Sequence, residues 1–302
     1  MEDKTFVQKL NEQKISYLFI ALPFTLFFVF QLAPVVMSFM WSFTEYNVVH
    51  APRFVGLDNY RRLFFEDPLF WKALGNTVIY VAGVVPLGVA LALLLAVAID
   101  QKIRFKNFFK SIFFLPTVTA MVAISVIWKW LYAGEKYGLL NHLLMVLGFQ
   151  PIDWLASPVW TLPAIMIMSI WAGVGYSMII FLAGLQTIPQ VMYEAAEIDG
   201  AGFWHKFFHI TLPLLKPTTV FVTIMSLIVS FQVFEQVYIM TGGQGGIGGV
   251  LNSALTIVAY LYDRGFEKFQ MGYASAIAYV IFAIVFVITM LNRRFMKFRV
   301  DY

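Results

Sequence analysis

The sequence contains no cysteine, so disulfide bonds, thiolate nucleophiles and cysteine-ligated metal sites are excluded. It also has few charges. Asp, Glu, Lys and Arg make up 13% of the residues, against about 25% in soluble domains, while hydrophobic residues make up 60%. This composition indicates a membrane protein. Its net charge of +4 is therefore expected to come from basic loops on one side of a bilayer rather than from a nucleic-acid-binding surface.

Long apolar runs are the main feature of the chain. A helix needs about 20 mostly apolar residues to cross the hydrocarbon core. The first run follows a polar stretch, lacks a small-residue cleavage site and is too long for a signal peptide, so we expect it to be retained as a span. We predict an all-α membrane protein with six transmembrane helices. The expected spans are residues 15–43, 73–99, 111–132, 159–185, 217–240 and 271–292.

The distribution of basic residues predicts the orientation of these spans. With the N-terminus in the cytoplasm, 13 of the 21 Lys and Arg residues fall on the cytoplasmic side and 8 on the outer side. This bias favours cytoplasmic segments at residues 1–14 and 293–302, so that both termini lie in the cytoplasm. Residues 44–72 then form an extracytoplasmic loop, and residues 187–216 face the cytoplasm.

Residues 187–216 are predicted to form more secondary structure than a short connection between two spans needs. Thr187, with Gln190 three residues later, fits a capping box, and Pro189 suits a first helical turn. Asp199-Gly200 supplies turn chemistry, because glycine adopts positive φ without strain. A second helix over residues 203–210 is expected to bury aromatic rings at the membrane interface. Prolines 213 and 217 are expected to end this helix and lead into the fifth span.

The first of these helices has an unusual surface. Its residues Glu194, Ala195, Ala196 and Glu197 are small or acidic. Small side chains allow close approach of another protein, and exposed carboxylates can pair with its Arg or Lys residues. Composition leaves two interpretations open, a knob that enters a groove of a partner protein and an ordinary interfacial loop.

The same segment carries a recognisable motif. Glu194-Ala195-Ala196, Gly200 six residues after the glutamate, and the run Ile210-Thr211-Leu212-Pro213 resemble the EAA loop of permeases from binding-protein-dependent ABC importers. Asp199 and Ala201 fit as well. Residues from about 50 to 292 are similar to the oligosaccharide and glycerol-phosphate branch of that family. The further matching motifs are Phe54–Tyr60 (FVGLDNY), Phe70–Thr77 (FWKALGNT), Phe181–Gln186 (FLAGLQ) and Met271–Ala276 (MGYASA).

The resemblance implies a type I ABC importer permease fold, with its core at residues 73–292, and a chain that does no chemistry itself. A second permease (expected to be a different chain), two ATPase subunits and an extracytoplasmic binding protein would complete the transporter in a prokaryotic plasma membrane. ATP and Mg²⁺ would bind the ATPases, and no cofactor or metal is expected here. The implied ATPase-docking residues are Glu194, Ala195, Ala196, Asp199, Gly200 and Ala201. The sequence has no G-x-x-x-x-G-K-[ST] motif, and the glycine-rich run 242–249 lacks lysine.

Polar residues within spans point to a solute pathway, because they are costly in a bilayer. By the resemblance, Gly173, Tyr176 and Ser226 fall on cavity positions, and Ser230 shares the helix face of Ser226. An alternative is that both serines bond their own helix backbone. Val229 and Val233 occupy the same expected face, where some relatives carry larger or more polar groups. The partner permease could therefore hold most of the specificity.

Three other features give weaker evidence for a functional site. Glu235 is the one acid expected deep within a span, and we assign it a structural role. Lys129, near a span end, is expected to extend its amine toward the membrane surface. His205 and His209 have metal-ligand spacing, but no third ligand accompanies them in the sequence.

The expected function is carbohydrate import, with an oligosaccharide favoured over glycerol-3-phosphate because the cavity residues include no Arg or Lys. The alternative is an ion-coupled secondary transporter of a sugar-like solute, a class that usually shows repeated halves and several midplane acids. A membrane-bound enzyme would need convergent catalytic acids or a histidine cluster, and the sequence has neither.

Overall fold

The computed structural model describes residues 14–101, 104–134, 137–242 and 246–295. The expected cytoplasmic segment 1–14, the tail 293–302 and the glycine-rich run 242–249 therefore lie wholly or partly outside the described residues. The described chain is helical apart from one two-stranded sheet. It divides into two compact units. The smaller comprises the residues up to Phe65 with Arg264–Tyr279, and the larger comprises Glu66–Asp263 with the residues from Val280 onward.

The smaller unit begins with one long apolar helix, the expected first span. It consists of α2 (Lys14–Phe27), a π-helical turn η1 (Phe28–Leu32) and α3 (Ala33–Ser42). The π turn ends two residues before Pro34, which cannot donate a backbone hydrogen bond and whose ring would crowd the carbonyl one turn back. Almost none of this helix is buried within the chain, as expected for a helix surrounded by lipid or by another subunit.

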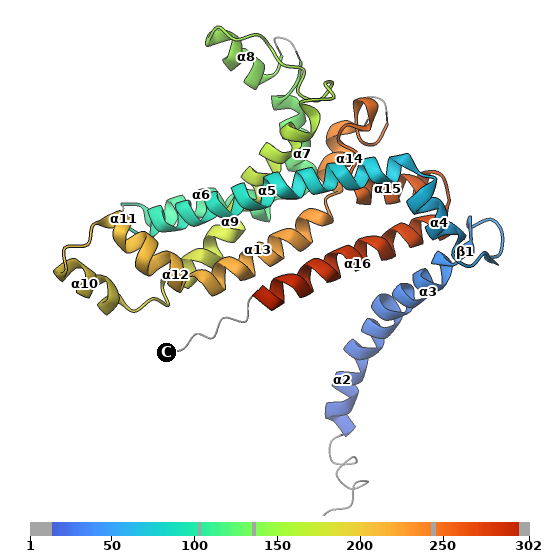
Figure 1. The fold of residues 1–302 in the computed structure, drawn as a ribbon, viewed down its shortest axis with the longest axis horizontal. Helices are drawn as coiled ribbons and strands as arrows, with labels where there is room; N and C mark the ends of the chain where they lie inside the picture. The colour runs from blue at the N-terminus through green and yellow to red at the C-terminus, as the bar shows by residue number, and fades with distance from the viewer. Residues whose placement is uncertain (1–13, 102–103, 135–136, 243–245, 296–302) are drawn as a thin grey trace, which may run out of the picture. The chain divides into compact units, whose positions relative to one another are not determined.

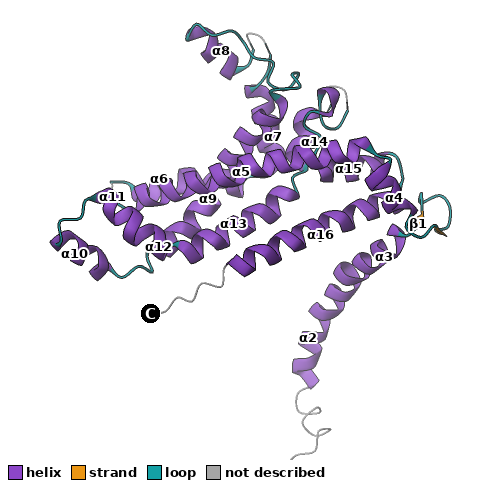
Figure 2. Ribbon diagram, in the orientation of Figure 1, coloured by secondary structure: helices purple, strands orange, loops and turns teal. Residues whose placement is uncertain are grey.

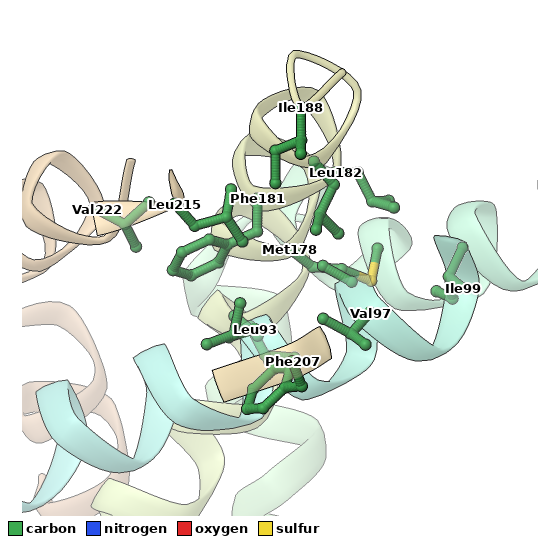
Figure 3. Close-up of a cluster of buried hydrophobic side chains, with 14 residues drawn as sticks. Leu93, Val97, Ile99, Met178, Phe181, Leu182, Ile188, Phe207, Leu215 and Val222 are labelled. Atoms are coloured by element: carbon green, nitrogen blue, oxygen red, sulfur yellow. The ribbon is translucent and has the colours of Figure 1, made fainter. Parts of the chain in front are cut away.

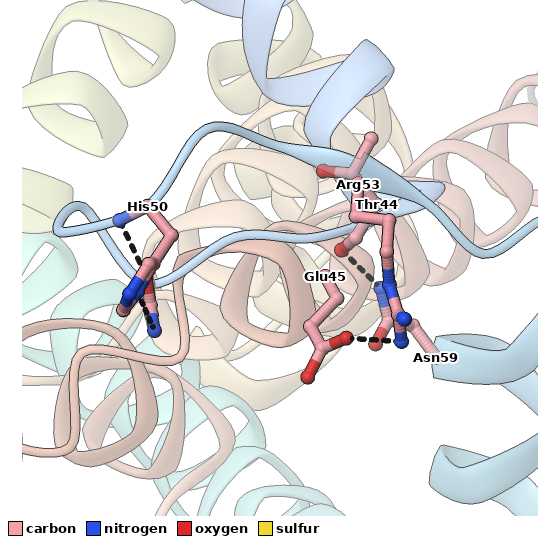
Figure 4. Close-up of polar contacts among 6 residues, drawn as sticks. Thr44, Glu45, His50, Arg53 and Asn59 are labelled. Atoms are coloured by element: carbon pink, nitrogen blue, oxygen red, sulfur yellow. Dashed lines mark hydrogen bonds and ion pairs between the residues drawn. The ribbon is translucent and has the colours of Figure 1, made fainter.

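A short hairpin follows this helix. Strand β1 (Thr44–Glu45) pairs antiparallel with β2 (Arg53–Phe54), and the Arg53 guanidinium lies 2.7 Å from the Glu45 carboxylate (Figure 4). The Asn59 amide, on α4 (Asp58–Phe65), donates to the carbonyls of Ser42 and Thr44, both at 2.9 Å. The matched FVGLDNY segment thus ties the end of the helix to the hairpin.

The larger unit is built on the long helices α5 (Pro68–Asp100), α9 (Thr161–Leu185) and α13 (Lys216–Phe231), which lie side by side in Figure 1. Helix α9 packs against α5, α6 (Lys106–Val118) and α13. The Asp67 carboxylate caps α5 by accepting from the backbone nitrogens of Leu69 and Phe70, and it also accepts from the Tyr260 hydroxyl.

The remaining elements are α7 (Met121–Leu131), α8 (Leu139–Val146), α10 (Gln190–Ile198), α11 (Phe203–Lys206), η2 (Phe207–Thr211), α12 (Leu212–Leu214), α14 (Glu235–Thr241), η3 (Val250–Asn252), α15 (Ile257–Tyr262), η4 (Asp263–Glu267) and α16 (Met271–Phe295).

The six expected spans are only partly confirmed. Four described helices are long and apolar enough to cross a bilayer: Ser16–Ser42, Pro68–Asp100, Thr161–Leu185 and Met271–Leu291. Two further candidates are bent pairs, so the number is six only if each pair is one span.

The expected span 111–132 is a bent pair rather than one straight helix. It is divided between α6 and α7, which meet at 99° where Thr119 and Ala120 adopt non-helical backbone angles. Pro116 lies in the last turn of α6, where its missing N–H weakens the helix.

The expected span 217–240 also ends early. Helix α13 stops at Phe231, and Gln232–Phe234 separate it from the short helix α14. Its bent partner is the helical segment Phe203–Leu214, at 66°. Glu235 therefore does not lie deep in a continuous span. It is exposed in the first turn of α14, where a carboxylate interacts favourably with the helix dipole.

Close packing of α9 on α6 depends on one glycine. A Cβ added at Gly175 would lie 2.0 Å from the Phe113 carbonyl oxygen, whereas a Cβ at Gly173 would meet nothing within 4 Å. Gly175→Ala should therefore push the two helices apart and lower stability by about 1–3 kcal/mol, with Gly173→Ala close to wild type. The thermal unfolding midpoints of the purified variants in nanodiscs test this expectation, and equal midpoints would contradict it.

Candidate functional site

The segment from residue 186 to residue 215, here called the α9–α13 loop, is mostly helical (Figure 2). Helix α10 starts after Pro189, which occupies the N-cap position in an extended conformation without a side-chain capping bond. The predicted capping box is wrong. The Thr187 hydroxyl instead donates to the Gly184 carbonyl at 2.7 Å, so it completes the end of α9 rather than the start of α10.

The glycine break is confirmed. Gly200 has a φ of +78°, its nitrogen donates to the Glu197 carbonyl at 3.0 Å, and the Ala201 nitrogen donates to the Ala196 carbonyl at 2.8 Å. This pair of bonds is the Schellman pattern that ends a helix with a left-handed residue. A Cβ at Gly200 would meet no atom within 4 Å, so the backbone conformation, and not lack of space, favours glycine.

The second helix of the loop is longer than predicted. It runs through α11, η2 and α12 to Leu214, so Pro213 does not end it. The π-helical turn η2 precedes the proline and widens the helix where the missing backbone N–H would otherwise break it. The chain then bends before Lys216, with Pro217 in the first turn of α13.

Two side-chain contacts join the helices of the loop. The Lys206 amine lies 2.6 Å from the Glu197 carboxylate, and the hydroxyls of Tyr193 and Thr211 are 2.9 Å apart. Glu197 is thus engaged inside the loop. Glu194 is exposed and makes no ion pair within the described residues, which leaves its carboxylate available to a partner protein.

The other matched residues of this motif also lie at the surface. Ala195 and Asp199 are exposed, while Ala196 and Ala201 are half-buried. A partner protein could therefore approach the backbone of α10 closely at Ala195, because the alanine side chain is small and exposed.

The base of the loop is fixed in a hydrophobic cluster (Figure 3). Phe207, before the bend, and Leu215, at the bend, are buried there at 8% and 1% exposure. They join Phe181 of α9 and Leu93 of α5 in one cluster. The base of the loop and the long helices therefore share one close-packed interior, and such interiors transmit strain.

The other aromatic rings of α11 and η2 point away from the described chain. Phe203, Trp204 and Phe208 are 49%, 64% and 54% exposed. These rings are available for burial in the membrane interface, as the sequence predicts. His205 and His209 stack with ring centroids 4.1 Å apart, and the described residues contain no group of three or more potential metal ligands.

A cavity of about 340 Å³ lies between α5, α9 and α13. All four expected pathway residues line it: Gly173 and Tyr176 from α9, and Ser226 and Ser230 from α13. Gly173 leaves its part of the wall open because no side chain fills the space. Val229 also lines the cavity, whereas Val233 lies beyond the end of α13 and is buried elsewhere.

The hydroxyls of α13 differ in their bonding. Thr219 and Thr223 donate to the carbonyl one turn back, at 3.0 and 2.7 Å. Within the described residues Ser226 and Ser230 make no such bond, so the alternative that they bond their own backbone is not supported by the structure. Their hydroxyls are free to bond to a solute.

The sequence analysis missed Tyr80 and Ser169, two polar residues that line this cavity. The Tyr80 hydroxyl on α5 lies near Ser169 and Gln236, and the Gln236 amide donates to the Ser169 hydroxyl at 3.5 Å. Ser169 stands four residues before Gly173, so helical spacing could have identified it. Tyr80 has no comparable signal, because its neighbours in sequence are apolar.

Lys129 has a more specific role than predicted. Its amine, on α7, donates to the carbonyls of Ile239 and Gly242 at 3.2 and 3.0 Å. These carbonyls lie at the C-terminal end of α14, where a cation also interacts favourably with the helix dipole. Lys129 therefore holds α14 in place against α7.

The fold and the α9–α13 loop define the membrane component of an ABC transporter, and sequence comparison gives the family. Residues 84–298, more than half of the chain, match the model of the binding-protein-dependent transport system inner membrane component. The chain belongs to this family. It is 37% identical over 290 residues to the probable ABC transporter permease protein YesP of Bacillus subtilis, an alignment that covers 95% of this chain and 92% of the relative.

Two further relatives have named solutes. The arabinooligosaccharides transport system permease protein AraP of Bacillus subtilis is 37% identical, covering 93% of this chain and 88% of AraP. The lactose transport system permease protein LacF of Rhizobium radiobacter is 38% identical, covering 92% of each chain. A solved bacterial ABC transporter involved in import of the acidic polysaccharide alginate superposes with a TM-score of 0.84 at 22% identity, covering 97% of this chain and all of its own. This last match supports the fold.

These relatives are permease subunits and not enzymes. The chain is accordingly a multi-pass membrane permease, as predicted, and the ATPase is a separate subunit.

Two neighbouring phenylalanines test how the loop is anchored. Phe207→Ala removes a ring from the buried cluster and should destabilise the local packing by about 3–5 kcal/mol, which exposes residues 186–215 to protease. Phe208→Ala removes an exposed ring and should leave cleavage close to wild type. Limited proteolysis of both variants in nanodiscs measures the difference. Equal cleavage rates would show that the cluster does not hold the loop.

Proposed function

We propose that this chain is one permease subunit of an ATP-driven importer that moves a carbohydrate, an oligosaccharide, delivered by an extracytoplasmic binding protein. The observation that carries the proposal is the cavity, where hydroxyl and aromatic side chains meet in an otherwise apolar site. Sugars require both hydrogen-bonding groups and an apolar face. The named solutes of AraP and LacF, an arabinooligosaccharide and lactose, support the same class.

In this proposal the α9–α13 loop is the coupling loop to a separate ATPase. Glu194 pairs with a basic residue of the ATPase cleft, Ala195, Ala196 and Ala201 pack against it, and Gly200 holds the turn that Asp199 precedes. ATP and Mg²⁺ bind the two ATPase subunits. Closure of the ATPase pair moves the loop, and the buried cluster passes this movement to the long helices.

The rest of the assembly follows from the same class. A second and different permease subunit completes the pathway and supplies the other half of the solute contacts. The complex lies in a prokaryotic plasma membrane, with both termini of this chain in the cytoplasm. The four lining residues Gly173, Tyr176, Ser226 and Ser230 form this chain's share of the pathway.

Uptake into proteoliposomes tests the proposal. The complete transporter should accumulate labelled lactose or arabinotriose only when the binding protein is outside and ATP is inside, and vanadate should abolish uptake. A protonophore should have no direct effect. Uptake that survives vanadate, needs no binding protein and collapses with the protonophore would support ion-coupled transport and contradict the proposal.

A further inference from the structure

One group of cavity residues lies at the end of the cavity remote from the α9–α13 loop. Tyr80 is the first residue of α5 to line the cavity, Ser169 is the first of α9, and Gln236 follows the end of α13. The opposite ends of these helices pack at the base of the loop. We call Tyr80, Ser169 and Gln236 the polar trio.

Burial of the polar trio costs free energy unless its polar groups form hydrogen bonds. Tyr80 and Ser169 are only 2% and 8% exposed, in a cavity whose other walls are largely apolar. A buried polar group without a partner loses the hydration it had in water, and polar groups within the bilayer mark functional positions. The Gln236 amide meets part of this cost by donating to the Ser169 hydroxyl at 3.5 Å, and the Tyr80 hydroxyl lies near the same two groups.

The bonds within the trio leave capacity unused. The Gln236–Ser169 contact, at 3.5 Å, is long for a hydrogen bond, while Ser169 donates its proton to the Ile165 carbonyl at 2.8 Å. A glutamine amide offers two donors and two acceptor sites, and a serine oxygen can accept a second bond. A sugar hydroxyl, which donates and accepts, can therefore insert between Gln236 and Ser169 without leaving either group unpaired.

The position of Gln236 is set independently of α13. The residue lies on α14, beyond the break at Gln232–Phe234, and Lys129 holds the other end of that helix. The amide is thus presented to the cavity by a short helix fixed to α7. If α14 served only to pack against α9, the Gln236 side chain would not need to border the cavity.

We infer that Tyr80, Ser169 and Gln236 form a hydroxyl-binding subsite that selects among sugar solutes at the end of the cavity remote from the coupling loop. The inference rests on the proposed carbohydrate import and adds to it the residues that discriminate between one sugar and another. Tyr176, Ser226 and Ser230 line other parts of the cavity, so a sugar in this subsite could contact both groups.

Deoxy sugars test the subsite. The variants are Tyr80→Phe, which removes only the hydroxyl, and Gln236→Met, which keeps the side-chain length. Thr223→Val is the matched control, because it removes a hydroxyl from α13 that does not line the cavity. The full transporter in proteoliposomes is given lactose, arabinotriose, maltose or raffinose. Each sugar that the wild type imports is compared with its single-deoxy analogues by kcat/KM.

The wild type should prefer the sugar over at least one deoxy analogue, and each variant should reduce that preference about three- to tenfold through the loss of one hydrogen bond. Thr223→Val should keep the wild-type preference. The binding protein is the same throughout, so its own selectivity cancels. Immunoblots and ATPase activity stimulated by the binding protein report folding and assembly.

Unchanged preference in both variants, with normal uptake, would overturn the subsite and leave the proposed function intact. Equal loss of uptake for sugar and analogue would also overturn it, because the trio would then only fasten helices together. Absence of ATP-dependent uptake of all four sugars by the wild type would instead overturn the proposed function, and the subsite with it.

Discussion

The buried contact between the α9–α13 loop and the long helices is the constraint on which the rest of the structure depends. Phe207 and Leu215 enter the same cluster as Phe181 and Leu93. Apolar burial of this kind is non-directional and, because the packing is dense, stiff. The exposed motif around Glu194 is therefore connected to α5, α9 and α13 through well-packed side chains. A loop that only tethered two spans would not need this anchorage.

The cavity is lined by the same helices, but hydrogen-bonding groups as well as apolar packing determine its properties. Its apolar walls tolerate the membrane interior, and a few hydroxyl and amide groups supply direction. Ser226 and Ser230 make no bond to their own helix within the described residues, while the Gln236 amide donates to Ser169 beside Tyr80. The cluster at the base of the loop and the cavity share Val174 of α9 and Val222 of α13, which allows movement at one to change access at the other.

The sequence predicted the helical membrane class, the glycine turn at Gly200 and the gathering of Gly173, Tyr176, Ser226 and Ser230, because these follow from hydropathy, backbone preference and motif resemblance. It did not predict the bend at Thr119–Ala120 or the early end of α13, since hydropathy averaged over a span of about 20 residues does not resolve a break of two or three residues. The capping box at Thr187 failed because the end of α9 uses that hydroxyl. Tyr80 was missed because contacts between distant helices have no local sequence signal.

The most direct test of the central claim is a disulfide cross-link from this cysteine-free chain to its ATPase. A single cysteine replaces the exposed Ala195, and a second lies in the docking cleft of an ATPase whose own cysteines are removed. The control carries its cysteine at the exposed Leu87 of α5. Our account predicts an oxidised cross-link at Ala195 that changes in yield with ATP, and none at Leu87. No cross-link in any nucleotide state, from a complex that co-purifies intact, would contradict it.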